Sequence, residues 1–332
     1  MKSQQSLPIA AYSVIPKARM SQITTDIELA AHALASGKLV AFPTETVYGL
    51  GADATNPVAV ARIYAVKGRP LNHPLIVHIP SADFLTSWAK DTPRYALQLA
   101  DSFWPGPMTL ILKRTQLAED FITGSQDSVG VRVPSHPVSQ ELLARFAELG
   151  GKGVAAPSAN KFGRVSTTSS VAVMEDLAGS MQEGDLILEG TDSDIGIEST
   201  IIDCTGSTPA ILRPGAITSH MIRKVTGLEV SEGDSRVRVS GSMDKHYSPM
   251  AKVVLDGLAQ PGDGLIAMSD VVTPQGVIRL CEPRTVEEYA SVLYSSLRLA
   301  DQLKLTRVVA ISPSGDGLAL AIRNRLAKAS AE

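Results

Sequence analysis

Short apolar segments that end in proline or in polar turns recur through the first 215 residues of this 332-residue chain. Examples are "LVAFP" (39–43), "LIVHI" (75–79) and "VGVRVP" (129–134). Apolar runs of this length, bounded by turn residues, are typical of buried strands. Helices interrupt them at irregular intervals, and we expect these helices near 25–36, 57–67, 137–148 and 170–178. The pattern predicts the α/β class, with an open, twisted, mixed sheet and no regular βαβ series.

The composition changes at residues 228–249, which are polar, rich in glycine and serine, and lack a helical period. Four more apolar strands and two helices, near 285–304 and 316–329, follow this stretch. Roughly 85 residues are enough for a small α/β domain with its own core. We therefore predict three parts. They are a larger α/β domain at 21–215, a helix and linker at 216–249, and a smaller Rossmann-like α/β domain at 250–332.

Charge and cysteine content exclude several classes of protein. The net charge is −3, and residues 1–215 hold 17 Lys plus Arg against 21 Asp plus Glu. A site for a polyanion must therefore be a local pocket, because no overall basic field surrounds the chain. Cys204 and Cys281 form no C-x-x-C pair, which excludes a zinc ribbon or a disulfide framework and suits the reducing cytoplasm. No apolar run is long enough to span a bilayer, and residues 1–20 read as a loose or strand-like arm, not a signal peptide.

Two polar clusters at strand ends suit an anion. In "KGRP", Lys67 and Arg69 combine a movable ammonium with a rigid fork of donors, a pairing suited to phosphate oxygens. In "PSANKFGRVS", Ser158 and Asn160 are expected to project in the same direction, and Ser166 follows before a helix. The ordinary alternatives are surface cations and an Asx or Ser turn with a helix cap. The hydroxyl-rich stretch "TETVYGLGADA" (44–54) reads as a polar turn.

Single residues elsewhere add to these clusters. Arg132 lies inside an apolar strand, where an unpartnered guanidinium is costly, so we expect it to meet a carboxylate of a ligand or of the protein. His78 taken alone is more often structural than functional. Ser199 and Arg213 lie at strand ends further along the chain. Walker A, G-x-G-x-x-G, H-E-x-x-H and G-x-S-x-G motifs are absent from the sequence, so dispersed residues would have to hold any nucleotide.

Together these motifs resemble one family. Their order is "PTETVYGL", "KGRP", "PLIVH", "WPGPMT", "VRVP", "PSAN", "GIESTIID" and "LRPG". This series is similar to the YrdC/Sua5 family in its two-domain, threonylcarbamoyl-AMP synthase form, and it covers about 21–215. The resemblance implies the open mixed sheet of the YrdC-like type. The remainder, with "HYSP" in the linker, resembles the Sua5 C-terminal domain more loosely.

The resemblance implies an enzyme that converts L-threonine, bicarbonate and ATP into L-threonylcarbamoyladenylate and pyrophosphate. In such proteins the product is handed to the machinery that makes N6-threonylcarbamoyladenosine at position 37 of tRNA. ATP is a substrate, and Mg²⁺ is expected to accompany the triphosphate. No acidic cluster in the sequence reads as a dedicated metal cage. Direct contact with tRNA is weakly supported, and no membrane partner is expected.

The resemblance also assigns candidate roles to residues at matching positions. The implied catalytic residues are Lys67, Arg69, Ser158 and Asn160. The implied ATP contacts are Arg69, His73, Ser128, Ser158, Ser166, Arg213 and Tyr247. The implied threonine contacts are Thr46, His78, Arg132, Ala156 and Ser199. The family commonly has Asn at the position of His73 and Thr at the position of Ser128.

Other interpretations stay open. A tRNA- or double-stranded-RNA-binding module without catalysis would need many more cations than residues 1–215 offer. A carbamoyltransferase of the HypF type shares a YrdC-like domain but carries zinc-finger cysteines. The linker, 228–249, is expected to fold back as a lid that brings Tyr247 to the nucleotide. The alternative is a solvated tether with Tyr247 packed on the second domain.

Overall fold

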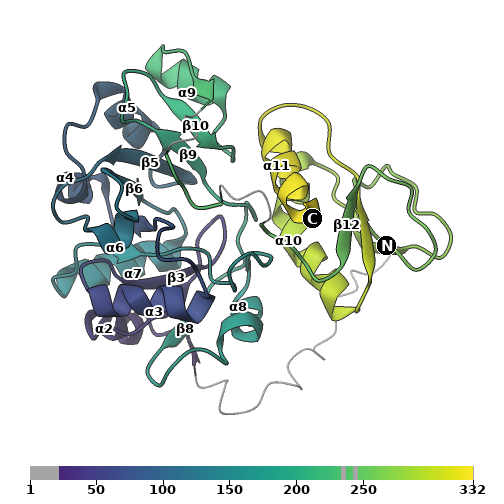
Figure 1. Ribbon diagram of the computed structural model, residues 1–332, viewed down its shortest axis with the longest axis horizontal. Coiled ribbons are helices and arrows are strands. Elements are labelled where there is room, and N and C mark those ends of the chain that lie inside the picture. Colours follow the sequence, from purple (N-terminus) through teal and green to yellow (C-terminus); the bar gives the residue numbers. More distant parts are fainter. Residues whose placement is uncertain (1–21, 233–236, 242–245, 332) are drawn as a thin grey trace, which may run out of the picture.

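The structure, a computed structural model, describes residues 22–232, 237–241 and 246–331. The arm predicted for residues 1–20 lies outside these ranges, as do parts of the predicted lid. The described chain forms two sheet-containing parts (Figure 1), the second of which follows the linker. No helix among the described residues is both long and apolar enough to cross a membrane.

The first part is built on one mixed sheet, which confirms the predicted open α/β architecture. Its eleven described strands lie in the order β1-β8-β2-β3-β7-β4-β6-β5-β9-β10-β11, with both parallel and antiparallel neighbours. The strands are β1 (Ile23–Thr24), β2 (Val40–Phe42), β3 (Gly49–Asp53), β4 (Ile76–His78), β5 (Met108–Lys113), β6 (Ser128–Arg132), β7 (Val154–Ala155), β8 (Leu186–Leu188), β9 (Thr200–Asp203), β10 (Ala210–Arg213) and β11 (Ser231–Glu232).

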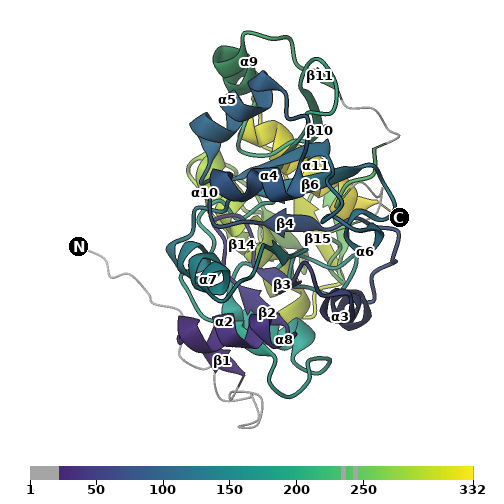
Figure 2. The ribbon, with the colours of Figure 1, turned by 90° about the vertical axis from the view of Figure 1, so that its left-hand side faces the viewer.

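Helices cover both faces of this sheet (Figure 2). They are α2 (Ile27–Ala35), α3 (Pro57–Lys67), α4 (Leu85–Trp88), α5 (Arg94–Phe103), α6 (Asp120–Thr123), α7 (Pro137–Glu148), α8 (Ser170–Leu177) and α9 (Ser219–Thr226), with a short 3₁₀ helix at Ala82–Phe84. The positions predicted for the helices at 57–67, 137–148 and 170–178 agree with these bounds.

Local sequence signals determine where α3 begins and ends, and so where its last residues lie. The Asn56 side chain accepts hydrogen bonds from the backbone N–H groups of Val58 and Ala59, and proline occupies the first helical position. Gly68 ends the helix with φ +67°, a left-handed conformation that glycine adopts without strain. Lys67 is thereby the last residue of the helix, and Arg69 begins the turn that leads to β4.

The prediction of a polar turn at residues 44–54 is wrong in its second half. Gly49–Asp53 is strand β3, which pairs antiparallel with β2. A Cβ at Gly51 would lie 2.7 Å from Val154 Cγ1 and 2.8 Å from an atom of the Phe42 ring. The glycine makes room for side chains of the neighbouring strands. Glycine usually indicates a turn, but at this position it lies within a strand.

The second part is a smaller parallel sheet, as the Rossmann-like prediction required. Its strands lie in the order β12-β15-β13-β14 and all pair in parallel. They are β12 (Lys252–Leu255), β13 (Gly264–Ile266), β14 (Ile278–Cys281) and β15 (Arg307–Ala310), with helices α10 (Val286–Gln302) and α11 (Leu318–Ser330). Both helices lie toward the first part (Figure 1). Val47, Val165 and Ile197 of the first part share a buried apolar cluster with Tyr289 and Tyr294 of α10.

Candidate active site

A cavity opens where the ends of β4, β6 and β10 meet the turn after β2 and the segment after β7. Many of the residues predicted to bind ligands line it. These are Thr46, Arg69, His78, Arg132, Ala156, Ser158, Ser199, Arg213 and Tyr247. Further lining residues include Glu198, Ser240, Gly241 and His246. The cavity therefore brings together segments as distant in the sequence as Thr46 and Tyr247.

Lys67 ties two of the predicted clusters to each other. Its ammonium donates to the backbone carbonyls of Ser158 and Asn160, each at 2.5 Å. The side chain is buried, and burial, reinforced by the nearby charge of Arg69, lowers the pKa of Lys67 well below its usual value. An anion close to this ammonium would relieve the cost of burying it.

Arg69 and Arg213 converge on one linker residue. Arg69 Nη2 donates to the Pro74 carbonyl at 2.9 Å and to Ser240 Oγ at 3.1 Å. Arg213 Nη1 donates to the Ser240 carbonyl at 3.0 Å. Burial lowers the pKa of Arg69 to about 10 and also lowers the pKa of Arg213. Buried cations whose charged form is disfavoured in this way are a sign of a site built for an anion.

Arg132 meets a carboxylate of the protein, which answers the question that the sequence left open. Its Nη2 donates to Glu45 Oε1 at 2.7 Å, and both side chains are buried. The Ser135 backbone N–H donates to the other oxygen of Glu45 at 3.1 Å. Arg132 Nε has no hydrogen-bond partner in the structure. The guanidinium is held in place by Glu45 and keeps a donor that a ligand can use.

His78 lies beside Arg132, because β4 and β6 pair in parallel with these two residues in register. It is buried and packs edge-on against the Phe42 ring, with 5.8 Å between ring centroids. Burial, and then the charge of Arg132, lower the pKa of His78 to about 3. The imidazole is therefore neutral at physiological pH, and its Nδ1 atom has no partner.

Ser166 binds a buried carboxylate, that of Glu198, and Ser199 follows Glu198 directly in the sequence. Ser166 Oγ donates to Glu198 Oε1 at 2.7 Å. Since the hydroxyl gives its only proton to this carboxylate, it can only accept a hydrogen bond from a ligand. Ser199 Oγ accepts from Arg213 Nη2 at 3.1 Å and lies 2.9 Å from Thr109 Oγ1.

Five of the predicted residues do not line the cavity: Lys67, Asn160, His73, Ser128 and Ser166. The Asn160 amide donates to the backbone carbonyls of Lys161 and Arg164, both at 2.8 Å. We had expected the Asn160 side chain to project in the same direction as Ser158. Instead it turns into its own loop. His73 packs edge-on against Phe162, at 5.4 Å between centroids, and is only partly exposed.

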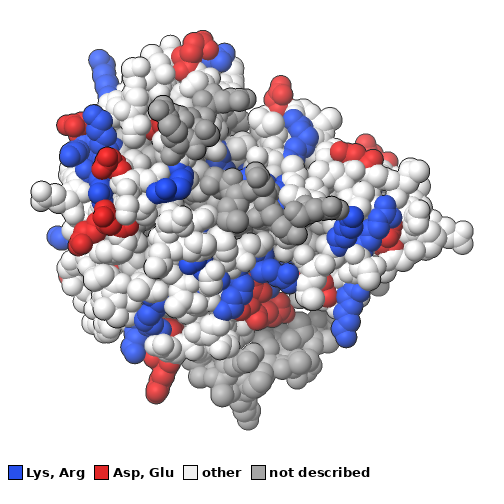
Figure 3. Space-filling model, in the orientation of Figure 1, with Lys and Arg blue, Asp and Glu red and all other residues white. Residues whose placement is uncertain are grey.

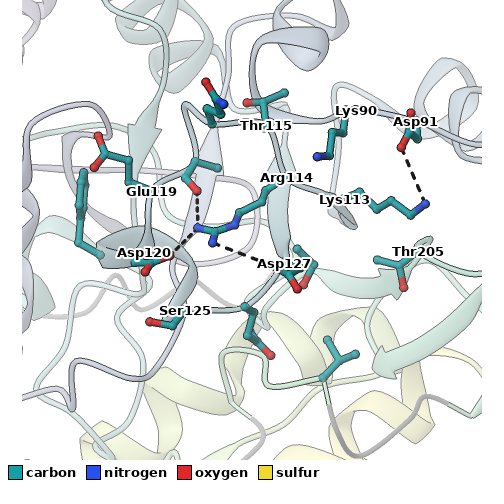
Figure 4. Close-up of a pocket in the computed structure, with 16 residues that line it drawn as sticks. Lys90, Asp91, Lys113, Arg114, Thr115, Glu119, Asp120, Ser125, Asp127 and Thr205 are labelled. Atoms are coloured by element: carbon teal, nitrogen blue, oxygen red, sulfur yellow. Dashed lines mark hydrogen bonds and ion pairs between the residues drawn. The ribbon is translucent and has the colours of Figure 1, made fainter.

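A large groove next to the cavity has mixed charges (Figure 4). Ser128 lies on its border. Arg114 is paired there with Asp120 at 2.7 Å, and Lys113 is 3.8 Å from Asp91. Because carboxylates compensate these cations, the groove lacks the excess positive charge of the cavity.

Two described parts of the linker, 237–241 and 246–249, border the cavity through Ser240, Gly241, His246 and Tyr247. Tyr247 stacks on Tyr294 of α10, with 5.6 Å between ring centroids. The Arg325 guanidinium lies 5.5 Å from the centroid of the same tyrosine ring. Tyr247 thus lines the cavity and also packs on the second domain. We had treated these two positions as alternatives, but the structure shows both at once. Residues 233–236 and 242–245 of the predicted lid lie outside the described ranges.

Comparisons with known proteins show the family of this chain. A family model described as "Telomere recombination", for Sua5, YciO and YrdC proteins, matches residues 32–215. A model described as "Threonylcarbamoyl-AMP synthase, C-terminal domain" matches residues 217–331. The chain belongs to the two-domain Sua5/YrdC family.

Relatives match this Sua5-type chain along nearly its whole length. The threonylcarbamoyl-AMP synthase of Pyrococcus abyssi is 39% identical over 92% of this chain and 94% of the relative. That of Bacillus subtilis is 36% identical over 91% and 92%. The crystal structure of P. abyssi Sua5 complexed with L-threonine matches with a TM-score of 0.82 and 38% identity, over 92% of this chain and 94% of that one.

Glu198 is the residue of this Sua5-type site that sequence reasoning missed. It stands directly before Ser199 in "GIEST", and an acidic residue within a predicted substrate-binding motif was the available signal. Burial raises its pKa, but Arg325 and Arg213 and the Ser166 hydroxyl outweigh that effect and lower the pKa to about 2. The carboxyl group is therefore ionised at neutral pH.

Glu198 is expected to contribute to acid stability. Its folded-state pKa is about 2, against an ordinary value of 4.5. Its contribution to the free energy of unfolding is therefore fully present above pH 4.5 and is lost as the pH falls toward 2. The difference corresponds to about 3 kcal/mol. Denaturant unfolding of wild type and Glu198→Gln across this pH range should give stabilities that converge in acid. Parallel pH profiles of the two proteins would contradict the assignment.

Proposed function

We propose that this chain synthesises L-threonylcarbamoyladenylate and pyrophosphate from L-threonine, bicarbonate and ATP. The observation that carries the proposal is the cavity. It joins two buried cations of depressed pKa, Arg69 and Arg213, to a second group formed by Arg132 and His78. A third such cation, Lys67, contacts the lining residue Ser158 through its backbone carbonyl. The names of the full-length relatives support the same reaction.

The chemistry needs positioning and charge more than a protein nucleophile. The threonine amine attacks the bicarbonate carbon to form a carbamate, and water leaves. A carbamate oxygen then attacks the α-phosphorus of ATP, a new P–O bond forms, and the bond to pyrophosphate breaks. Holding the reactants in line and stabilising the charge on the phosphates are the main requirements of such a transfer.

The nucleotide half of the site is proposed to comprise Arg69, Arg213, Ser158 and Tyr247, supported by Lys67. Arg69 and Arg213 already hold the carbonyl and hydroxyl oxygens of Ser240, and oxygens of the triphosphate would compete for the same donors. Lys67 adds positive charge behind Ser158. Asn160, Ser166, His73 and Ser128 stay predicted ATP-site residues, which would have to act from beside the cavity or after a rearrangement.

The threonine half is proposed to comprise Thr46, His78, Arg132, Ala156 and Ser199. The free Nε–H of Arg132 suits the threonine carboxylate. His78 is neutral, so it can offer either a donor or an acceptor without adding a second positive charge. The complex of P. abyssi Sua5 with L-threonine supports this half of the proposal.

Mg²⁺ is expected to enter with ATP as part of the substrate. Among the residues that the structure describes, no group of three His, Cys, Asp or Glu side chains is arranged to hold a metal ion. The triphosphate itself offers the oxygen ligands that Mg²⁺ prefers. The protein's part would be to bind the metal–nucleotide complex through its cations.

The product would pass to the machinery that installs N6-threonylcarbamoyladenosine at position 37 of tRNA, and the reaction is expected in the cytoplasm. Direct tRNA binding has little support on the face shown in Figure 3, where basic and acidic side chains are interspersed. A nucleic-acid surface would need a continuous set of cations. An RNA-binding module without catalysis is therefore the weaker interpretation.

Product analysis tests the proposed function directly. Purified protein is incubated with ATP, threonine and bicarbonate, and the products are separated by mass. Threonylcarbamoyladenylate and pyrophosphate should form only when all three substrates are present. If neither product forms while the protein binds duplex RNA tightly, the binding-module interpretation would replace this one.

Limited proteolysis tests the predicted covering of the site by the linker. Arg238 is exposed, and its backbone N–H donates to the Gln126 side chain at 2.8 Å. Trypsin should cut after Arg238 more slowly in the presence of ATP and threonine, because a filled site would hold residues 237–241 more firmly. A cleavage rate that saturating ligands leave unchanged would argue against this role and leave the cation assignments untouched.

A further inference from the structure

The Glu198 carboxylate lies between the cavity and the C-terminal domain. One oxygen accepts from Ser166 of the catalytic domain. The other accepts from Tyr294 OH of α10 and from Arg325 Nε of α11, both at 2.8 Å. Arg325 is 1% exposed and Glu198 6%, so the contacts are shielded from water. Two of these three donors therefore come from the C-terminal domain.

The loop that carries Glu198 also rests on the backbone of α10. Gly196 has φ +73°, and a Cβ there would lie 2.4 Å from Ser291 Cα and 2.5 Å from the Ala290 carbonyl oxygen. No other residue fits both the conformation and the space. The C-terminal domain thus packs directly against the loop that carries Glu198 and Ser199.

Glu198 would hinder the binding of a polyanion if nothing neutralised it. Of the described residues that line the cavity, it is the only acidic one. The titratable and charged groups that face it come from every element packed around it, and they are Arg213 of β10, His246 and Tyr247 of the linker, Tyr294 of α10 and Arg325 of α11. Arg213 is expected to serve the nucleotide, which leaves Arg325 as the cation dedicated to this carboxylate.

We propose that Arg325 and Tyr294 are positioning residues of the active site, which act through Glu198 and make ATP binding depend on the C-terminal domain. The inference rests on the proposed function. Arg325 cancels the negative charge beside the phosphate-binding cations, and Tyr294 fixes the carboxylate against Ser166. The C-terminal domain would then complete the catalytic site without contributing a group that touches the reacting atoms.

A charge-rescue experiment tests this proposal in the full-length chain. ATP affinity is measured by titration calorimetry for wild type, Arg325→Met, Glu198→Gln and the double variant. Arg325→Met should bind ATP at least about tenfold more weakly, because it leaves a buried carboxylate unpaired at the site. The double variant should bind ATP as Glu198→Gln does, since no unpaired charge remains. The proposal would be overturned if Arg325→Met bound ATP with wild-type affinity. It would also be overturned if Arg325→Met weakened ATP binding equally in the wild-type and Glu198→Gln backgrounds.

The pH dependence gives a readout that a purely structural role would not move. Without Arg325, burial should raise the pKa of Glu198, so that protonation on mild acidification removes its charge. ATP affinity of Arg325→Met, relative to the double variant at the same pH, should therefore recover as the pH falls. A constant ratio across the pH range would count against the role of Glu198.

Matched variants separate this effect from loss of fold or of function. Arg298 of α10 also pairs across the domains, with Asp176 of α8 at 2.8 Å, but lies outside the cavity. Arg298→Met should keep wild-type ATP affinity. If Arg325→Met does not fold, Tyr294→Phe replaces it, and its effect on ATP binding should vanish in the Glu198→Gln background. If the wild-type protein forms no adenylate product, the proposed function is wrong. If the wild-type protein forms the product but Arg325→Met and Arg298→Met bind ATP equally well, only the present inference is wrong.

Discussion

Replacing Arg69 by alanine is expected to weaken ATP binding at least about tenfold and to remove most adenylate formation, while the fold stays intact. A charge-assisted hydrogen bond contributes about 1.5–3 kcal/mol, and Arg69 is expected to make more than one to the triphosphate. Burial already lowers the pKa of this guanidinium to about 10. Its removal relieves a desolvation cost, so the melting temperature of Arg69→Ala should equal or exceed that of wild type.

Titration calorimetry with ATP and thermal unfolding together check this result. Arg114→Ala is the matched control, because Arg114 lies in the neighbouring groove and is neutralised by Asp120. It should leave ATP affinity unchanged. Lys67→Ala should behave as Arg69→Ala does, since both cations are buried at the same end of α3. Wild-type turnover in both Lys67 and Arg69 variants would show that the anion site has been assigned wrongly.

Replacing Arg132 is expected to have two separable effects, one on threonine binding and one on stability. Arg132→Lys should weaken threonine more than ATP, because an ammonium cannot reproduce the planar fork of donors. Arg132→Ala should also lower the free energy of unfolding by about 3–5 kcal/mol, because it leaves the buried Glu45 carboxylate without its cation.

A double variant apportions the stability effect. In the Glu45→Gln background no buried charge is left unpaired, so Arg132→Ala should cost much less stability there. Threonine affinity should nevertheless stay low in this double variant, because the carboxylate-binding donors are still missing. Equal weakening of ATP and threonine by Arg132→Lys, measured in separate titrations, would remove the proposed role in threonine binding.

Much of the architecture was predictable because its signals are local. The helices α3, α7 and α8 lie where capping residues, proline and glycine placed them, and the strands of the second domain follow their apolar runs. Gly51 shows the limit of such signals. Glycine usually indicates a turn, but here it admits Phe42 and Val154 from neighbouring strands, which no local pattern reveals.

The cost of burying an unpartnered charge predicted that Arg132 would have a partner. Arg132 in an apolar strand demanded a carboxylate, and one is present. The identity of that carboxylate, Glu45, depends on how the turn after β2 packs against β6. Asn160 was expected to face a ligand from strand alternation, yet the chain turns after Ser158 and its amide binds loop carbonyls instead.

The sequence by itself determined the α/β class and the two-domain order, because periodicity and capping act within short segments. It also offered the cations Lys67, Arg69, Arg132 and Arg213 as candidate site residues. Only the tertiary structure decided which of these cations meet, since Lys67 reaches Ser158, and Arg69 and Arg213 meet at Ser240, through pairings of distant segments. It also decided that Glu198 bridges the cavity and Arg325, which lies 127 positions away. Contacts over such separations depend on the packing of two domains, and a single sequence does not record that packing.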